Sequence, residues 1–119
     1  MVKQNIKEKI KGMQDTAKEL LKIPEWGVSV EVRSMTGRDR ARMFDLFLDD
    51  KGQLKKADSY PFIVVASTYD PETGERLFGE DDMAWIMEKN ANALDRIITV
   101  SFKLSGLEGK KSVEAAEKN

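Results

Sequence analysis

The sequence predicts a mainly helical α+β domain, and three patterns support this prediction. Apolar residues recur at helical spacing near the N-terminus, and again between an N-cap signal at Asn90 and a stop signal at Gly106. Between these stretches, Val28, Val30 and Val32 alternate with polar residues, which is typical of a strand with one buried face. Turn and cap signals divide the remainder into short helices. We therefore expect an N-terminal helix, a β-hairpin around residues 19–34 and then a small helical bundle.

The N-terminal apolar stripe admits two interpretations. Its members follow a 4-3-4-3 spacing: Ile6, Ile10, Met13, Ala17 and Leu20. On this pattern alone the helix covers residues 3–22, and Pro24 stops it because the residue before a proline avoids helical geometry. The strand over residues 28–32 nevertheless needs a partner. A turn at residues 25–27 would let Leu21 and Ile23 pair back with it, and the first helix would then end near Ala17.

Cap and turn residues place the later elements. Thr36-Gly37-Arg38-Asp39 resembles a capping box and predicts a helix, which Asp49-Asp50-Lys51-Gly52 would end. A second start signal lies at residues 58–61, where an Asp-Ser pair precedes a proline. The following residues 62–65 are apolar and largely β-branched, which is equally typical of a strand. The pattern of residues 60–69 therefore fits either a helix or a strand, and the start signal favours the helix.

The acidic middle of the chain contains a turn and one more helix start. Residues 70–74 read Asp-Pro-Glu-Thr-Gly, which predicts a turn, and Glu80-Asp81-Asp82 places three acids where a helix N-terminus favours them. We expect one domain over residues 1–107. Residues 108–119 contain one Val and no aromatic residue, so they cannot bury enough surface to offset the entropy of ordering, and we expect a flexible tail.

The composition excludes several classes of chemistry. The chain has 119 residues with no Cys and no His, which removes disulfides, thiolate nucleophiles and the Ser-His triad. An active site would have to be built from carboxylates, Lys, Tyr and hydroxyl groups. The acidic groups show neither the spacing of a calcium loop nor a paired nucleophile. We therefore expect no catalytic residue, no cofactor and no metal. The longest apolar run, residues 62–66, is far too short to span a membrane, so we expect a soluble cytoplasmic protein without membrane contact.

The net charge of −1 conceals an uneven distribution. Residues 1–48 hold 10 basic and 7 acidic groups, whereas residues 49–82 hold 4 basic and 9 acidic groups. Four arginines gather around one helix start: Arg33, Arg38, Arg40 and Arg42. Such a cluster can contact nucleic-acid phosphates, but no set of aromatic residues for stacking accompanies it. We expect ion pairs with Asp39, Asp45 or the acidic segment instead, and no nucleic-acid binding.

The apolar stripe and the aromatic residue at the predicted turn each have two explanations. The stripe either packs on the domain's own core or docks on a partner or a second copy. Trp26 is either a lid on the core or an anchor in an interface. The candidate partner-binding residues, with two arginines of the basic cluster, are Ile6, Ile10, Met13, Trp26, Arg38 and Arg42.

The order of these segments resembles a known family, the tail assembly chaperones of long, flexible-tailed phages and prophages. The similar stretches are Ile23 to Arg42, Tyr69 to Phe78 with the acids at 80–82, Ala93-Leu94, Arg96-Ile97-Ile98 and Leu104-Ser105-Gly106-Leu107. They cover about residues 18 to 107 in order. No single motif is specific to the family, and it is their combination that carries the resemblance.

The resemblance implies a non-enzymatic role without cofactors. Chaperones of this family bind the tape measure protein and the tail tube protein before the tail polymerises, act in the cytoplasm of the bacterial host and are absent from the mature virion. The resemblance also favours the hairpin over a continuous first helix. The main rival is a structural head–tail connector or tail completion protein, which would have a similar size and composition.

Overall fold

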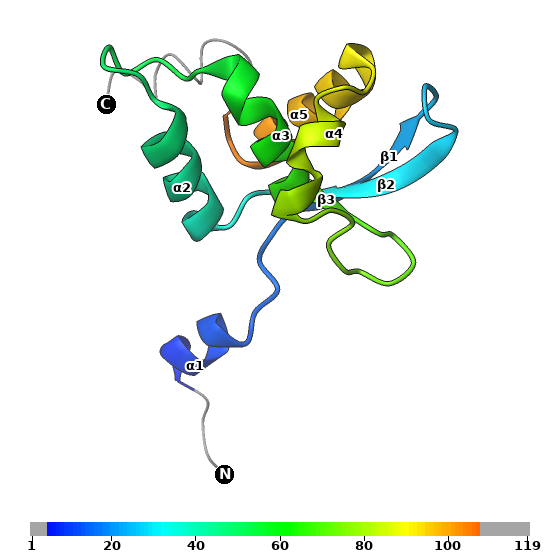
Figure 1. The fold of residues 1–119 in the computed structure, drawn as a ribbon. Coiled ribbons are helices and arrows are strands. Elements are labelled where there is room, and N and C mark those ends of the chain that lie inside the picture. The colour runs from blue at the N-terminus through cyan, green and yellow to red at the C-terminus, as the bar shows by residue number, and fades with distance from the viewer. Residues whose placement is uncertain (1–4, 108–119) are drawn as a thin grey trace.

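The computed structural model describes residues 5–107, with side chains at all of these positions except 56 and 57. The predicted tail over residues 108–119 lies outside the described residues. In chain order the elements are α1 (Ile6–Lys11), β1 (Lys18–Ile23), β2 (Val28–Arg33), α2 (Gly37–Phe47), α3 (Lys56–Ser67), β3 (Thr68–Tyr69), the 3₁₀ helix η1 (Glu80–Asp82), α4 (Met83–Ile86) and α5 (Ala91–Leu104). Helices α2 to α5 gather beside a small sheet, and α1 stands apart from both (Figure 1). This confirms a mainly helical α+β fold. Within the described residues, no helix is long and apolar enough to cross a membrane.

The sheet is antiparallel in the order β1-β2-β3. The predicted hairpin is present, with Ile23 opposite Val28 and Leu21 opposite Val30. Gly27 closes the turn with a φ of 67°, a left-handed conformation that glycine adopts without steric cost. Directly opposed residues share a face, so the register puts Ile23, Val30 and Val32 on the buried side.

The core lies between that inner face and two helices. Helix α5 packs against β1, β2 and α3, and α3 packs in turn against α2 and α4. The fully buried large side chains of this core come from all of these elements: Ile23, Val30, Val32, Met43, Ile63, Val64, Ile86 and Ile97. A hydrogen bond of 2.7 Å between the Ser67 and Ser101 hydroxyls joins α3 to α5 inside the core.

Residues 60–69 contain both predicted structures. Helix α3 continues to Ser67, and the chain then extends into the two-residue strand β3. Every residue from Pro61 to Thr68 is buried, and a helix surrounded by other elements tolerates apolar, β-branched side chains on all its faces. The helix begins at Lys56, two residues before the predicted start signal, so Pro61 lies inside the helix and not in its first turn.

The predicted N-terminal helix is much shorter in the structure. Helix α1 ends at Lys11, so Met13 and Ala17 lie beyond it and Leu20 belongs to β1. The expected helical stripe as far as Ala17 is therefore wrong. Asn5 caps the start by accepting a hydrogen bond from the Glu8 amide, and Gly12 caps the end. None of α1 is buried, so it lacks the tertiary packing that supplies most of the stability of helices in proteins.

The cap signals of the last helix are confirmed. The Asn90 side chain accepts hydrogen bonds from the amides of Asn92 and Ala93. At the other end Gly106 has a φ of 75°, and the Leu107 amide donates to the Phe102 carbonyl at 2.7 Å. This is the Schellman arrangement, in which a left-handed glycine lets the chain turn back, and it returns Leu107 to the core.

The burial pattern predicts that isoleucines of α1 and of α5 contribute very differently to stability. Ile6→Ser and Ile10→Ser should leave the free energy of unfolding unchanged, because both side chains are mostly exposed. Ile97→Ala should cost about 2–5 kcal/mol, since Ile97 is fully buried. Urea unfolding followed by circular dichroism measures both. A large loss in the Ile10 variant would show that α1 packs on the domain.

The hairpin turn is tied to α5 by an ion pair that should make stability depend on pH. Arg96 donates to both Glu25 oxygens at 2.9–3.1 Å, and this hydrogen bonding lowers the pKa of Glu25 below its ordinary value. A carboxylate with a lowered pKa stabilises the fold above its unfolded pKa, near pH 4, and this contribution is lost as the pH falls through the lowered value.

We therefore expect Glu25→Gln to melt below the wild type at pH 7, and the difference to shrink as the pH falls below about 4. Thermal melts of both proteins across this range measure the difference. A difference that stays constant from pH 7 to pH 3 would contradict the role of the Glu25 charge.

Candidate partner-binding surface

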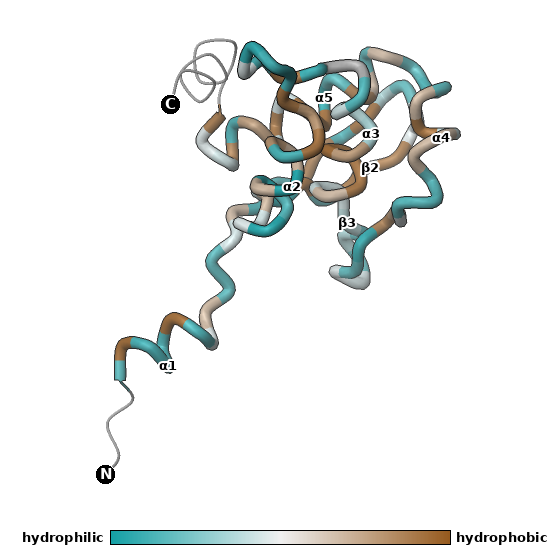
Figure 2. The backbone as a smooth tube through the Cα atoms, turned by 60° about the vertical axis from the view of Figure 1, so that its left-hand side comes forward, coloured by the Kyte–Doolittle hydropathy of each residue, from teal (hydrophilic) through white to brown (hydrophobic). Residues whose placement is uncertain are grey.

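The N-terminal arm, residues 5–13, is the most exposed apolar segment that the structure describes. Ile6 is 77% exposed, Ile10 60% and Met13 49%. Lysines flank the two isoleucines at positions 7, 9 and 11, and Glu8 is the one acid among them. Figure 2 shows hydrophobic and hydrophilic residues alternating along α1, away from the rest of the chain. The arm is thus an amphipathic, basic segment whose apolar side chains are left mostly exposed by residues 5–107.

The arm is anchored where it enters the sheet. The Ser34 amide donates to the Ala17 carbonyl at 2.8 Å, and the Ala17 amide donates to the Ser34 hydroxyl at 3.0 Å. These bonds fix the chain just before β1 begins at Lys18. Between Gly12 and Ala17 the chain forms no helix or strand, so it serves as a linker between the arm and the sheet.

The structure does not bring Trp26 together with the arm. Trp26 is half-buried at the hairpin turn and packs against the core, as the lid explanation expects. The turn and the arm lie at opposite ends of β1, whose six residues span about 20 Å. A partner could touch both only by running along the hairpin.

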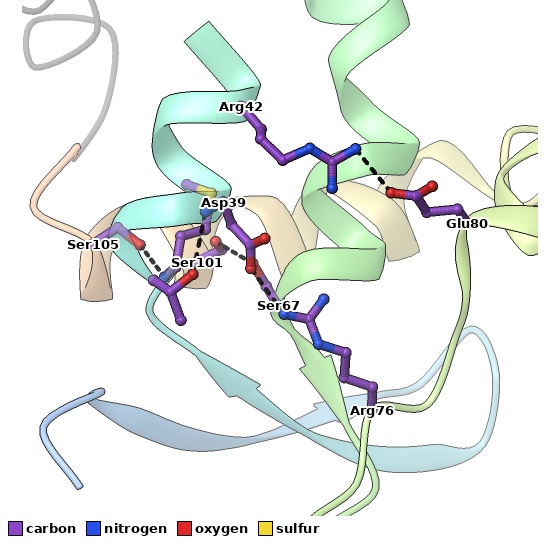
Figure 3. Close-up of polar contacts among 9 residues, drawn as sticks. Asp39, Arg42, Ser67, Arg76, Glu80, Ser101 and Ser105 are labelled. Atoms are coloured by element: carbon purple, nitrogen blue, oxygen red, sulfur yellow. Dashed lines mark hydrogen bonds and ion pairs between the residues drawn. The ribbon is translucent and has the colours of Figure 1, made fainter. Parts of the chain in front are cut away.

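The two candidate arginines lie one helical turn apart on α2 and differ in their contacts. Arg42 pairs with Glu80 at 3.0 Å (Figure 3). Its guanidinium also lies over the Phe62 ring, 5.4 Å from the ring centroid. Arg38 is exposed and has no ion pair with any residue from 5 to 107. Of this pair, Arg38 is therefore the cation more available to a partner.

The rest of the basic cluster is used inside the fold. Arg33 pairs with Glu31 at 2.7 Å, and its guanidinium lies 4.1 Å from the centroid of the Tyr69 ring. Arg40 donates to the Ser105 carbonyl. The expected pairing of the cluster with the acidic segment is confirmed by Arg42 and Glu80, whereas the alternative partner Asp39 accepts from Arg76 of the acidic segment at 2.8 Å (Figure 3).

Sequence reasoning missed an aromatic surface at the start of α4. The rings of Phe78 and Trp85 meet edge to face with centroids 5.6 Å apart, and Trp85 is 45% exposed. The Trp85 indole N–H donates to Asp82 at 2.8 Å. Asp82 also accepts a hydrogen bond from the Gly79 amide. The bond from the Gly79 amide, and to a smaller extent the bond from Trp85, lower the pKa of the Asp82 carboxyl. An exposed tryptophan within an acidic helix start was the available signal.

Within the described residues, neither exposed surface gathers a set of metal-ligating side chains. Across the described part of the chain, no group of three or more metal-ligating Asp or Glu side chains comes together. The exposed features are an amphipathic arm, unpaired charges and an aromatic pair. Groups of these kinds bind other polypeptides.

Comparisons with known proteins point to the same fold as the resemblance did. No family model and no curated protein sequence matches the chain. Among solved structures, the chain is similar to the bacteriophage HK97 tail assembly chaperone, with a TM-score of 0.60 and 17% sequence identity. The similarity covers 75% of this chain and 85% of that one. At this low identity the likeness establishes a shared fold: the chain is built like a phage tail assembly chaperone.

Proposed function

We propose that this protein is a non-enzymatic tail assembly chaperone, which binds the tape measure and tail tube proteins before the tail polymerises. The observation that carries the proposal is the fold shared with the HK97 tail assembly chaperone over most of both chains. The resemblance of residues 18–107 to that family is an independent support, because it rests on the order of motifs in the sequence.

The exposed arm gives this proposal a physical basis. A tape measure protein is long and largely helical, so its apolar faces need cover until the tail forms. An amphipathic segment with Ile6, Ile10 and Met13 uncovered offers apolar contact, and its short helix limits the buried area. Limited area suits a chaperone, which must release its partner. We propose that these three residues bind the partner, with Arg38, Arg42 and Trp26 contributing at separate positions.

A role in assembly also sets where the protein acts. We propose that it works in the cytoplasm of the bacterial host and leaves before the virion matures. In this role the protein binds other polypeptides non-covalently, and it makes or breaks no covalent bond. Self-association through the exposed apolar side chains is compatible with this role.

The partner-binding role of the arm predicts a clear loss in a pull-down with the tape measure protein. Ile10→Glu combined with Met13→Glu should reduce capture by at least about tenfold, because two charges replace the apolar contact. Asn92→Glu combined with Thr99→Glu adds the same charge at exposed positions of α5 and should leave capture unchanged. Unchanged capture by the arm variant, with a wild-type melting curve, would remove the arm from the binding surface.

Purified particles distinguish the chaperone from a structural protein of the virion. We expect quantitative mass spectrometry to detect this chain in lysates of tail-producing cells and to find it depleted from mature particles. A fixed stoichiometry in mature particles would instead identify a head–tail connector or tail completion protein.

A further inference from the structure

Strand β1 has a free edge along its length. The sheet order β1-β2-β3 gives β1 one neighbour among the described strands, and its pairing with β2 runs from Lys18 to Ile23. The other side of the sheet ends differently, because β3 has only two residues and its Tyr69 forms a further bridge with Arg76. Within residues 5–107, β1 therefore offers the longest open strand edge, and such an edge is a template for a further strand.

The register decides which backbone groups of β1 point away from the sheet. The Ser34 amide donates to the Ala17 carbonyl, and hydrogen-bonded pairs alternate with non-hydrogen-bonded pairs along an antiparallel ladder. Every second residue of β1, beginning with Glu19, therefore directs its N–H and C=O groups to β2. The other three residues direct these groups to the open side, and we call them the β1 edge: Lys18, Leu20 and Lys22.

The side chains of the β1 edge are exposed on the outer face of the hairpin. Leu20 is 67% exposed, and Lys22 on one side of it is exposed as well. Lys18 on the other side lies 3.9 Å from Glu31, and such a long pair between exposed groups is weak. The edge thus carries two positive charges around one uncovered apolar side chain.

This charge pattern selects the strand that can pair with the edge. A second copy is disfavoured, because antiparallel pairing about Leu20 would place Lys18 of one copy opposite Lys22 of the other. A strand with acidic residues at these two places would instead face each lysine with a carboxylate. We therefore propose that the β1 edge binds an extended, acidic segment of another polypeptide as a fourth strand of the sheet.

The inner face of the sheet sets the residues between the two acids. Leu21 is half-buried and packs on the core, so an apolar residue opposite it gains contact. Glu19 is held by Lys103 at 2.8 Å, so an uncharged polar residue suits the place opposite it. The matching antiparallel segment is Glu-Val-Val-Thr-Glu, with its two acids opposite Lys22 and Lys18.

This inference goes beyond the proposed function, because it concerns a different surface and a different conformation of the bound chain. The arm offers a helix with exposed isoleucines, whereas the β1 edge offers backbone groups and two lysines. Binding at the edge can be measured without the tape measure or tail tube protein, so the two proposals fail independently.

Synthetic peptides test the contact on the intact wild-type protein. The probe is a fluorescently labelled peptide, Gly-Ser-Glu-Val-Val-Thr-Glu-Ser-Gly, and fluorescence anisotropy measures its binding. We expect a dissociation constant below about 1 mM. N-methylation of the first acid, the second valine and the last acid removes the N–H groups that face β1, and it should weaken binding at least about tenfold. N-methylation of the first valine and the threonine, whose amides face away, should change the affinity less than about twofold.

Charge reversal of the edge tests the selectivity. Lys18→Glu combined with Lys22→Glu should weaken binding of the probe at least about tenfold, and should gain binding of a peptide with lysine at both acidic places. Lys7→Glu combined with Lys11→Glu makes the same charge change on the arm and should leave binding of the probe within about twofold. All four side chains are exposed, so thermal melts should match the wild type.

Three results would overturn the proposal. The first is no binding of the probe by the wild type up to about 1 mM. The second is equal weakening by the two N-methylation patterns, which would show that the backbone of the peptide does not pair with β1. The third is an equal effect of the edge variant and the arm variant, which would assign binding to net charge alone.

Discussion

The fold depends on the packing of α5 against the inner face of the β1–β2 hairpin. Ile97 is fully buried there, and Ile23, Val30 and Val32 supply the sheet side of the contact. Among the described helices, α5 makes the main contact with both β1 and β2, and two strands alone are marginal in water. The remaining elements follow from this contact: α3 lies against α5, and α2 and α4 lie against α3. The arm is left outside this core.

The uneven charge of the sequence is largely resolved inside the fold. The acidic segment is linked back to the basic half by two ion pairs, Arg42 with Glu80 and Arg76 with Asp39. Asp39 is buried, so its pair with Arg76 is a specific attachment of the segment to α2. Charges without an ion pair among the described residues include the arm lysines Lys7, Lys9 and Lys11, and Arg38.

The sequence could predict those parts of the fold that local chemistry decides. The alternation of Val28, Val30 and Val32 identified β2, and the signals at Asn90 and Gly106 correctly bounded α5. The length of α1 could not be predicted, because helical spacing says which residues would share a face but not whether anything covers it. Residues 60–69 were ambiguous for a related reason. Their apolar, β-branched side chains fit a helix only because α3 is buried on all its faces, and burial is not visible in the sequence.

The candidate site was predictable in part. Ile6, Ile10 and Met13 are all exposed, and although their spacing singled them out, only the structure shows that they are uncovered. The ion pairs of the arginine cluster depend on the path of the acidic segment, so the choice between Asp39 and that segment could not be made from the sequence. The aromatic pair of Phe78 and Trp85 joins a loop residue to α4, and no periodic pattern relates the two. Such contacts between irregular segments become visible only in the folded chain.

The central claim is that a stable core presents the arm as its binding segment. Hydrogen–deuterium exchange of the intact protein, with and without the tape measure protein, tests this claim most directly. The account predicts that the partner slows exchange in residues 6–13 and leaves α3 and α5 unchanged. Unaltered exchange in residues 6–13 in a saturated complex would contradict it.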